Sequence, residues 1–431
     1  MENNISQHAS KDQPSVEAML ARAEILFEQG CHQESLDISL QITRIHPELP
    51  VPWFNAAYNC LKLRRWQDAI RYAQTSLAHG GTRVELWDTL AFAYGELGQP
   101  EQARHYGLQA LETRDYYFNQ EPCIPLTELP SMPPLPGVQT CQRNVISFSL
   151  FGGNSQYCET AILNTQEQPG IYPHWICRFY VDNSVPASVI ERLQKGGAQV
   201  MHVDGAAARW PGPMWRLLAL ADPLVHRILF RDADSVISRR EAAAVNQWLT
   251  SGKRFHMMRD HCSHVELILA GMWGVAAGSL PPLGKLMERF MSAPPASRII
   301  ADQYFLRRYV WPYARASLMQ HDSVFGFMGA ANFPPEFPPE KIRDKILFVG
   351  ANEGGQVITA KTDLPDESKV IWKLFRSEKQ NDGPTSEQLI CAYPAVVRKG
   401  VVTIHIPVRY WLWIKQDMAY IRVVENNNMA A

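Results

Sequence analysis

The stretch RILFRDAD, residues 227–234, decides the fold prediction because a largely apolar run ends there in two acids. In an extended chain Asp232 and Asp234, spaced i and i+2, point to the same side. Like charges this close repel unless a cation lies between them or one carboxyl is protonated. A hard divalent metal with positions open for phosphate oxygens meets this need, so the stretch predicts a metal site. The alternatives are a solvated loop or helix-capping acids.

The residues around this stretch alternate between strand and helix patterns. Strands are expected near residues 145–150, 174–181, 199–203 and 227–231, with helical stretches near residues 155–166, 186–195 and 215–221. Short connections between such segments predict an α/β domain with a mostly parallel sheet flanked by helices. Ligands of such sheets collect at the carboxyl ends of the strands. The two aspartates therefore stand where a ligand is expected.

A 34-residue period marks the amino-terminal part of the chain. Four positions of one pattern recur in three copies: Met19, Trp53 and Trp87; Ala23, Ala57 and Ala91; Gly30, Arg64 and Gly98; Ser35, Ala69 and Ala103. The apolar spacing within each copy is helical. The pattern resembles a tetratricopeptide repeat (TPR) array over residues 15–114. The resemblance implies an α-helical solenoid whose concave face binds a peptide or protein partner, and the alternative is an array that only packs against or dimerises the next domain.

Length and composition limit the class of protein. The chain has 431 residues, which suggests two or three domains, and its hydrophobic fraction of 46% supports a large core. The 42 basic and 43 acidic residues exclude a strongly basic nucleic-acid binder. No signal-peptide pattern is visible, the apolar stretch 267–278 is too short to span a bilayer, and the cysteines form no CxxC pair. We expect a cytoplasmic protein with reduced cysteines.

Proline content divides the chain. Residues 115–141 are rich in proline and predict a semi-extended linker between the repeats at 15–114 and the α/β domain at 142–352. Residues 353–431 form a carboxyl-terminal extension, with a loop expected over residues 376–388. Its aromatic residues Tyr410, Trp411 and Trp413 stand beside basic side chains. They predict an aromatic patch docked on the catalytic domain, or alternatively a segment that contacts glycans or holds the protein peripherally at a membrane.

Three runs of sequence carry a second resemblance: residues 215–219 leading to 231–235, residues 255–261, and residues 271–274. They resemble nucleotide-sugar glycosyltransferases of the GT-A type, over roughly residues 142–350. The resemblance implies that Asp232 and Asp234 hold Mn²⁺ or Mg²⁺, which bridges the donor diphosphate. It offers His321 as a third metal ligand, since neutral imidazole suits manganese. The alternative is that His321 is a surface turn residue.

The same resemblance assigns contacts to the donor. By position, Ser149 to Gly152 and Asp182 hold the nucleotide base and ribose, although ordinary turn chemistry explains these residues equally well. Arg216 either faces the diphosphate or pairs with an acid on the rim of the sheet. Arg259 and Asp260 are expected to contact the donor sugar or phosphate, which makes Asp260 a catalytic candidate.

The remaining candidates have open alternatives. Trp273 either stacks on the sugar or packs in the core, and Gly271 and Gly274 let the backbone approach a sugar. In the pair Asp302-Gln303, Asp302 is the base that takes the acceptor proton, a group that orients the sugar, or a structural acid. A separate zinc site is disfavoured because the spacing of three neighbouring histidines matches no zinc pattern: His256, His261 and His264.

These features predict a metal-dependent glycosyltransferase of the hexosyltransferase kind. It would move a sugar from a nucleotide-sugar donor to a glycan or protein acceptor, with repeats that recruit the acceptor or a partner. One alternative is a non-catalytic TPR scaffold with a transferase-like domain, and another is a metal-dependent phosphoesterase. The prediction requires that Asp232 and Asp234 face a cleft and are not buried against cations of the protein itself.

Overall fold

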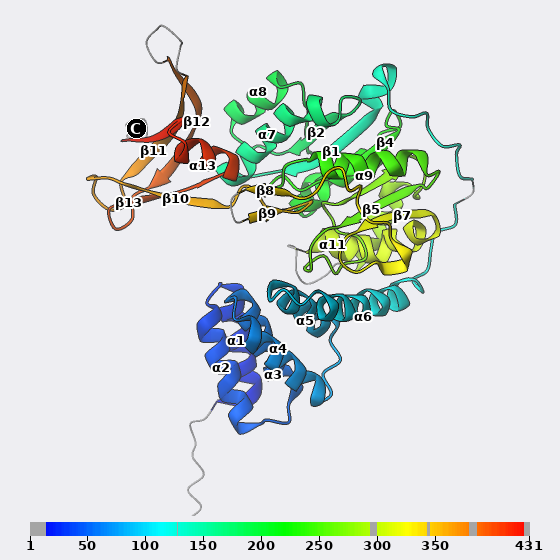
Figure 1. Ribbon diagram of the computed structural model, residues 1–431, viewed down its shortest axis with the longest axis vertical. Helices are drawn as coiled ribbons and strands as arrows, with labels where there is room; N and C mark the ends of the chain where they lie inside the picture. The colour runs from blue at the N-terminus through cyan, green and yellow to red at the C-terminus, as the bar shows by residue number, and fades with distance from the viewer. Residues whose placement is uncertain (1–13, 127, 294–299, 343–344, 379–385, 426–431) are drawn as a thin grey trace, which may run out of the picture. The chain divides into compact units, whose positions relative to one another are not determined.

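The computed structural model describes residues 14–126, 128–293, 300–342, 345–378 and 386–425. Two compact units divide the chain. The repeat unit contains the residues up to 117 together with residues 261–267 and 323–329, and the α/β unit contains the rest. Each unit is described by itself below, with helices and strands labelled as in Figure 1.

Six helices in three pairs form the repeat unit (Figure 1). They are α1 (Val16–Glu28), α2 (His32–Ile45), α3 (Pro50–Lys62), α4 (Trp66–Ala78), α5 (Val84–Glu96) and α6 (Pro100–Phe118). The alanines of the 34-residue pattern are buried at the seams, as the alanine position of the three copies shows: Ala23, Ala57 and Ala91. The structure therefore confirms the predicted α-helical repeat array.

The turn position of the repeats has a fixed backbone conformation. Gly30, Arg64 and Gly98 have φ angles of 78°, 57° and 70° between their paired helices. Glycine adopts this left-handed conformation without strain, whereas an arginine does so at a cost. The first copy has Ser35 where the other two have alanine. Its buried hydroxyl is satisfied because it donates a hydrogen bond to the carbonyl oxygen of Ala23 at 2.8 Å.

Two later segments of the chain belong to the repeat unit, and each packs closely against a glycine of a repeat helix. A side chain at Gly95 of α5 would collide with the side chain of Cys262, and one at Gly107 of α6 would collide with Phe325. Arg114 pairs with Asp88 at 2.5 Å. The 34-residue period does not reveal that residues beyond 117 complete this unit.

A seven-stranded sheet in the order β3-β2-β1-β4-β6-β5-β7 forms the centre of the α/β unit. Its strands are β1 (Asn144–Leu150), β2 (Ile176–Val181), β3 (Gln199–His202), β4 (Arg227–Phe230), β5 (Phe255–Arg259), β6 (Trp273–Ala276) and β7 (Leu318–Asp322). Only β6 among them is antiparallel to its neighbours, β4 and β5. The predicted mostly parallel sheet is thus confirmed.

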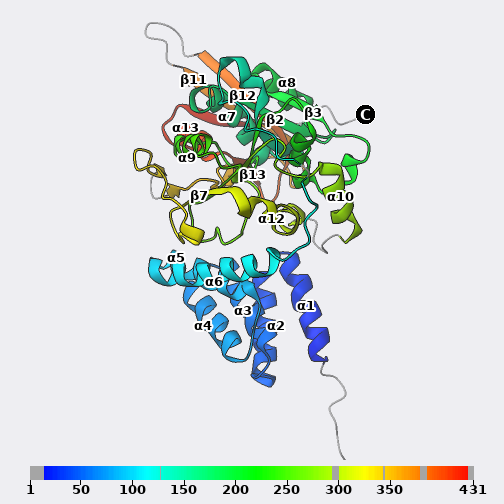
Figure 2. The same cartoon turned by 90° about the vertical axis from the view of Figure 1, so that its right-hand side faces the viewer.

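Helices cover this sheet (Figure 2). They are α7 (Ser155–Ile171), α8 (Ala187–Lys195), α9 (Arg239–Thr250), α10 (Leu283–Ser292), α11 (Ala301–Phe305) and α12 (Trp311–Ala314), with 3-10 helices η1 (Val138–Arg143), η2 (Ala207–Arg209), η3 (Gly212–Ala221) and η5 (Arg315–Ser317) and a π-helical turn η4 (Leu306–Val310). The 3-10 helix η6 (Phe327–Gly329) belongs to the repeat unit. The helix expected at 215–221 is therefore a 3-10 helix.

Side chains of β1 alternate between the two faces of the sheet. Phe148 and Leu150 enter the hydrophobic core together with residues of α7. Ser147 and Ser149 point the other way, and their hydroxyls donate to carbonyl oxygens of η3. The parallel pairing aligns Leu150 with Val181 of β2, so the carboxyl ends of these strands lie at one edge. That edge is where the candidate site forms.

The proline-rich segment lies on the α/β unit. The carbonyl oxygens of Pro133 and Pro134 accept hydrogen bonds from the guanidinium of Arg227. The carbonyl oxygen of Pro130 accepts from Arg254. These contacts hold the segment without making it part of the sheet.

The carboxyl-terminal extension folds into small antiparallel sheets, paired as β10 with β13 and as β12-β11-β14, after a β8–β9 hairpin. The elements are β8 (Glu340–Ile342), β9 (Lys345–Leu347), β10 (Gln356–Lys361), β11 (Lys369–Glu378), β12 (Ser386–Val396), β13 (Val401–Ile406), α13 (Val408–Lys415) and β14 (Ala419–Glu425). The loop predicted over 376–388 is wrong at both ends, where β11 and β12 continue, and its middle lies outside the described residues. Tyr410 of α13 is buried in the core of the α/β unit, which supports a docked aromatic patch. No helix among the described residues combines the length and the hydropathy needed to cross a membrane.

Candidate functional site

A cavity of about 750 Å³ lies at the carboxyl ends of β1, β2 and β4. Its lining comes from the end of β1, the first turn of α7, the turn after β2, the start of η3 and the loop after β4: Ser149, Leu150, Phe151, Gly152, Tyr157, Asp182, Ser184, Pro211, Gly212, Pro213, Trp215, Arg216, Asp232, Ala233 and Asp234. Six residues that the sequence predicts for the site therefore meet in one cavity.

The part of the cavity beside β1 and β2 is built from turns. The Gly152 N–H donates to the Ser184 hydroxyl at 2.7 Å, and Gly152 has a positive φ of 76°. The Asp182 carboxylate accepts from the Ser184 N–H at 3.1 Å. Ser149 accepts from the Arg216 N–H at 2.8 Å. These contacts are ordinary turn chemistry, and the same residues line the cavity, so their contact with a nucleotide stays a prediction.

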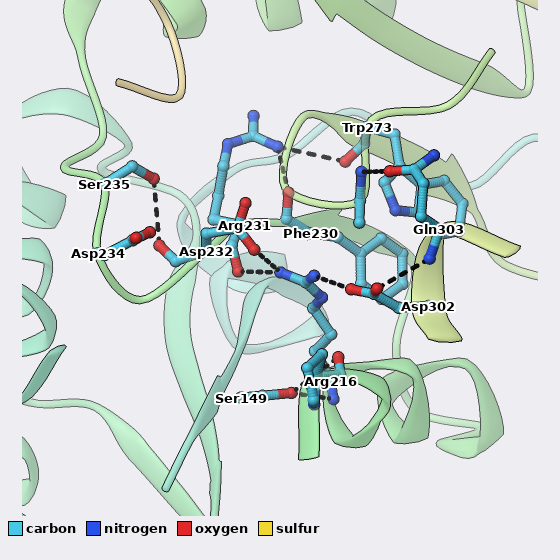
Figure 3. A network of polar contacts seen from close by, with 12 residues as sticks. Ser149, Arg216, Phe230, Arg231, Asp232, Asp234, Ser235, Trp273, Asp302 and Gln303 are labelled. Carbon is cyan, nitrogen blue, oxygen red and sulfur yellow. Dashed lines mark hydrogen bonds and ion pairs between the residues drawn. The ribbon is translucent and has the colours of Figure 1, made fainter. Parts of the chain in front are cut away.

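A buried guanidinium organises the acids of the site (Figure 3). Arg216 donates to Asp232 Oδ1 at 2.5 Å and to Asp302 Oδ2 at 2.6 Å. The Arg216 side chain is 4% exposed and that of Asp302 is 10% exposed, whereas the Asp232 side chain is 49% exposed. Asp232 therefore keeps half of its surface accessible while the protein fixes one of its oxygens.

The backbone opposite Asp232 leaves room for its carboxylate. A Cβ atom at Gly271 would overlap Asp232 Oδ2, so only glycine fits the present geometry. The sequence predicts that Gly271 lets the backbone approach a sugar. In the structure the space beside Gly271 is filled by the carboxylate of Asp232.

Asp234 lies in a different environment from Asp232. Burial and the negative charge of Asp232 raise the pKa of Asp234 to about 6. Its Oδ2 accepts from the side-chain amide of Asn352 at 2.7 Å. The helix-capping alternative is wrong for this residue, because α9 begins at Arg239 and its cap is Ser238, which accepts from the Glu241 N–H at 3.2 Å.

The charges of the network leave room for a divalent cation. Asp232, Asp234 and Asp302 contribute three negative charges and Arg216 contributes one positive charge, which leaves −2. The neighbouring Arg231 does not change this count, because it pairs with Glu241 at 2.9 Å. Burial is the larger cause of the raised pKa of Asp234, and the negative charge of Asp232 adds to it. This donor set of exposed and partly exposed carboxylate oxygens fits Mg²⁺ or Mn²⁺.

His321 does not take part in this site. Its Nδ1 lies 2.9 Å from His256 Nε2, and its Nε2 lies 2.8 Å from Gln247 Oε1. The residue is fully buried on β7, and β6 and β5 stand between β7 and β4 in the sheet. Burial lowers the pKa of His321 to about 4. The prediction that His321 is a third metal ligand is wrong, and so is its alternative as a surface turn residue.

Three more predicted contacts are wrong for the same reason, namely burial away from the cavity. Trp273 is fully buried and stacks on Phe230 with ring centroids 4.1 Å apart, so neither face is open to a sugar. Arg259 is 1% exposed and donates to Gln320 at 2.6 Å. Asp260 receives both nitrogens of the Arg240 fork, at 2.9 and 2.7 Å, so it is a structural acid and not a catalytic one.

Among the residues that the structure describes, Asp302 is linked to the site through Arg216. It does not line the cavity, and its second oxygen accepts from the Gln303 N–H at 2.8 Å. The Gln303 side chain receives the N–H of Ala270 and donates to the carbonyl oxygen of Ile268. The acid-amide pair thus fixes Arg216 and the segment before β6.

Sequence reasoning missed several lining residues. Tyr157 stands in the first turn of α7, and burial together with the charges of Asp234 and Asp232 raises the pKa of its phenol. Phe151 and Trp215 form an edge-to-face pair with centroids 5.6 Å apart. Phe151 lies within the predicted range 149–152, whereas Trp215 was not predicted to line the site, and its place at the start of a helical stretch is the signal that would have found it.

Comparison with known proteins adds little to this description. No protein-family model matches the chain, and no curated protein matches it. Among solved structures, YrrB, a TPR protein with an unusual peptide-binding site, is 16% identical with a TM-score of 0.22, covering 24% of this chain and 54% of its own. The first TPR of Spaghetti (RPAP3), bound to the HSP90 peptide SRMEEVD, is 20% identical with a TM-score of 0.22, covering 22% of this chain and 76% of its own. This chain spans about half the length of YrrB, and the repeat architecture rests on its own helices and turns.

Proposed function

We propose that the α/β unit is a divalent-metal-dependent glycosyltransferase that uses a nucleotide-sugar donor. One observation carries the proposal: a single cavity joins the end of β1, Asp182 after β2, and the aspartates after β4. In parallel sheets this edge is the usual place for a nucleotide. The volume of about 750 Å³ lies within the range of sites for small molecules and cofactors.

The cavity offers different chemistry at its two ends. At one end Phe151 and Trp215 supply aromatic surface and Asp182 supplies an acceptor for hydroxyl groups, which suits a base and a ribose. At the other end Asp232 and Asp234 supply the carboxylates. A bound Mn²⁺ or Mg²⁺ would neutralise the charge that develops on the departing nucleoside diphosphate.

Arg216 has a positioning role in this proposal. It fixes Oδ1 of Asp232, whose side chain stays 49% exposed and lines the cavity. Its second ion pair joins the guanidinium to Asp302, which does not line the cavity. Because Asp302 is already committed to a cation and lies outside the lining, we assign it to holding Arg216 and not to taking the acceptor proton.

The experiment is nucleotide binding by the full chain, measured by calorimetry with a panel of nucleoside diphosphates, with and without Mn²⁺. We expect binding that requires both components and is lost in Asp234→Asn. The matched control is Asp204→Asn, which removes an exposed acid after β3 and should bind normally. Failure of every nucleotide to bind with Mn²⁺ would favour the non-catalytic scaffold. Identification of the product then separates sugar transfer from hydrolysis.

The repeat unit supports a second activity, the binding of a peptide or protein partner. A cavity of about 380 Å³ lies between α2, α3 and α4, and its lining includes Arg44, Trp53, Arg71 and Tyr72. Two arginines beside two aromatic rings suit an acidic extended peptide. Titration with acidic and basic peptides tests this, and Arg44→Glu should abolish binding of the acidic ones. Equal binding of basic peptides would refute the assignment.

A further inference from the structure

Three potential metal ligands meet in the repeat unit, apart from the aspartates of the α/β unit. The segment 261–267, which follows β5 in sequence, belongs to the repeat unit. It brings His261 and Cys262 to Glu96, the last residue of α5. One ligand atom from each of the three residues lies within 4.8 Å of the other two.

Two of the three distances between these atoms are close to the edges of a metal tetrahedron, and the third, from Cys262 Sγ to the Glu96 carboxylate, is within 4.8 Å. With metal–nitrogen and metal–oxygen bonds of about 2.0–2.1 Å and a metal–sulfur bond of about 2.3 Å, tetrahedral angles place the ligand atoms about 3.3–3.6 Å apart. In the structure His261 Nε2 lies 3.5 Å from Glu96 Oε1. Cys262 Sγ lies 3.7 Å from the same nitrogen. Small side-chain rotations bring all three atoms onto one ion.

The ring of His261 is held by the nearby residue Ser263. His261 Nδ1 lies 2.8 Å from the Ser263 hydroxyl and accepts the Ser263 backbone N–H at 3.3 Å. The opposite nitrogen, Nε2, faces Glu96. Metal binding through Nε2 would place the ring proton on Nδ1, where the Ser263 hydroxyl oxygen can accept it.

The surroundings of Cys262 show that the helix makes room for its side chain. Gly95 stands directly before Glu96, and any side chain there would overlap Cys262 Sγ. Cys262 is 8% exposed, while the side chains of His261 and Glu96 are 23% and 33% exposed. The sulfur therefore lies at the inner end of the cluster, and the imidazole and carboxylate connect it to solvent, which provides a path for an ion.

We infer that Glu96, His261 and Cys262 form a binding site for a zinc-type divalent cation, with the fourth position open to water or an external ligand. A thiolate with an imidazole selects Zn²⁺ over Mg²⁺ or Ca²⁺, which prefer oxygen ligands. On binding, the thiol proton passes to solvent and the sulfur takes the metal.

The site would join the segment 261–267 to α5 inside the repeat unit. This segment directly follows Asp260, which is fixed by Arg240 at the end of β5. A metal bound by Cys262, His261 and Glu96 would fix the segment 261–267 to α5. The inference does not depend on the proposed glycosyl transfer, because none of its ligands lines the cavity of the α/β unit.

The experiment titrates the metal-free full chain with Co²⁺ and follows the thiolate-to-cobalt charge-transfer absorption. We expect one equivalent to bind, to be displaced by Zn²⁺, and to give no such band in Cys262→Ser. Glu96→Gln should weaken cobalt binding at least tenfold. Cys31→Ser is the matched control, since it removes another thiol of the repeat unit and should leave the band unchanged.

Several outcomes would overturn the inference. They are a wild-type protein without a saturable thiolate band, a band that survives Cys262→Ser, and equal affinity in Glu96→Gln and wild type. Glu96 is partly exposed, so Glu96→Gln decides the matter even if Cys262→Ser fails to fold. Asp234→Asn must keep the band, which separates this site from the one proposed for the nucleotide.

Discussion

Asp234→Asn should make the folded protein more stable at neutral pH while abolishing metal-dependent nucleotide binding. Asp234 faces the charge of Asp232, and its own Oδ2 is held only by the neutral amide of Asn352 among the contacts described. An asparagine has nearly the same shape and removes the repulsion. The substitution thus removes a carboxylate that could bind a cation and replaces it with a neutral amide, which stabilises the folded protein when no cation is bound.

The magnitude follows from the pKa of Asp234, which burial and then the Asp232 charge raise from 3.8 to about 6. At about 1.4 kcal/mol per pKa unit this corresponds to about 3 kcal/mol, and partial exposure of Asp234 reduces it to about 1–2 kcal/mol. Below pH 3.8 both folded and unfolded states are protonated, so the penalty is absent. It grows between pH 3.8 and 6, where only the unfolded state is ionised, and stays constant at higher pH.

The assay is urea unfolding of wild type, Asp234→Asn and the Asp204→Asn control, from pH 4.5 to 7.5. The difference between Asp234→Asn and wild type should increase with pH up to about 6 and then level off. Saturating Mn²⁺ with a nucleoside diphosphate should reverse the order, because only wild type binds them. A less stable Asp234→Asn at pH 7, or an advantage that does not change with pH, would refute the electrostatic reasoning.

Three further substitutions probe the network and the core. Arg216→Met should lower the free energy of unfolding by about 3–5 kcal/mol in urea, because it leaves the buried Asp302 without its ion-pair partner. Adding Asp302→Asn should restore at least half of this loss, and no restoration would contradict the pairing. Gly271→Ala should displace the Asp232 carboxylate and weaken manganese-dependent nucleotide binding about 10–100-fold in calorimetry, with the melting temperature nearly unchanged. His321 has a folded pKa lowered to about 4, so wild type should lose stability as the pH falls from 6.5 towards 4, and His321→Gln should lose less over that range in the same unfolding assay.

Local patterns account for the parts of the fold that were predicted correctly. The 34-residue period is visible because each helix pair needs the same small residues and the same turn, and Gly30, Arg64 and Gly98 indeed share one backbone conformation. The strand ends were found because an apolar run that stops at an acid or a glycine is a local signal. Asp182 and Asp232 then share a cavity because parallel pairing brings the strand ends to one edge.

The failures involve contacts between residues far apart in sequence. Nothing near His321 indicates that His256, 65 residues earlier, will contact it inside the sheet. Asp260 reads as a free acid at a strand end until Arg240 of α9 folds over it. Trp273 has an ordinary alternation pattern, and only the stacked Phe230 on the adjacent strand decides that it is core. Charge and aromaticity were visible in the sequence, whereas burial was set by partners that local pattern reading does not reveal.

The role of Arg216 shows how the structure changes the meaning of a motif. The sequence presents Asp232 and Asp234 as an equivalent pair. The structure makes them unequal, because Asp232 already has a buried cation at 2.5 Å and Asp234 has a neutral amide at 2.7 Å. With three carboxylates and one guanidinium, the protein supplies part of the positive charge and leaves the equivalent of a divalent ion to be supplied from outside. In the proposed function Arg216 therefore does not replace the metal: it holds Asp232, one of the proposed ligands, in place.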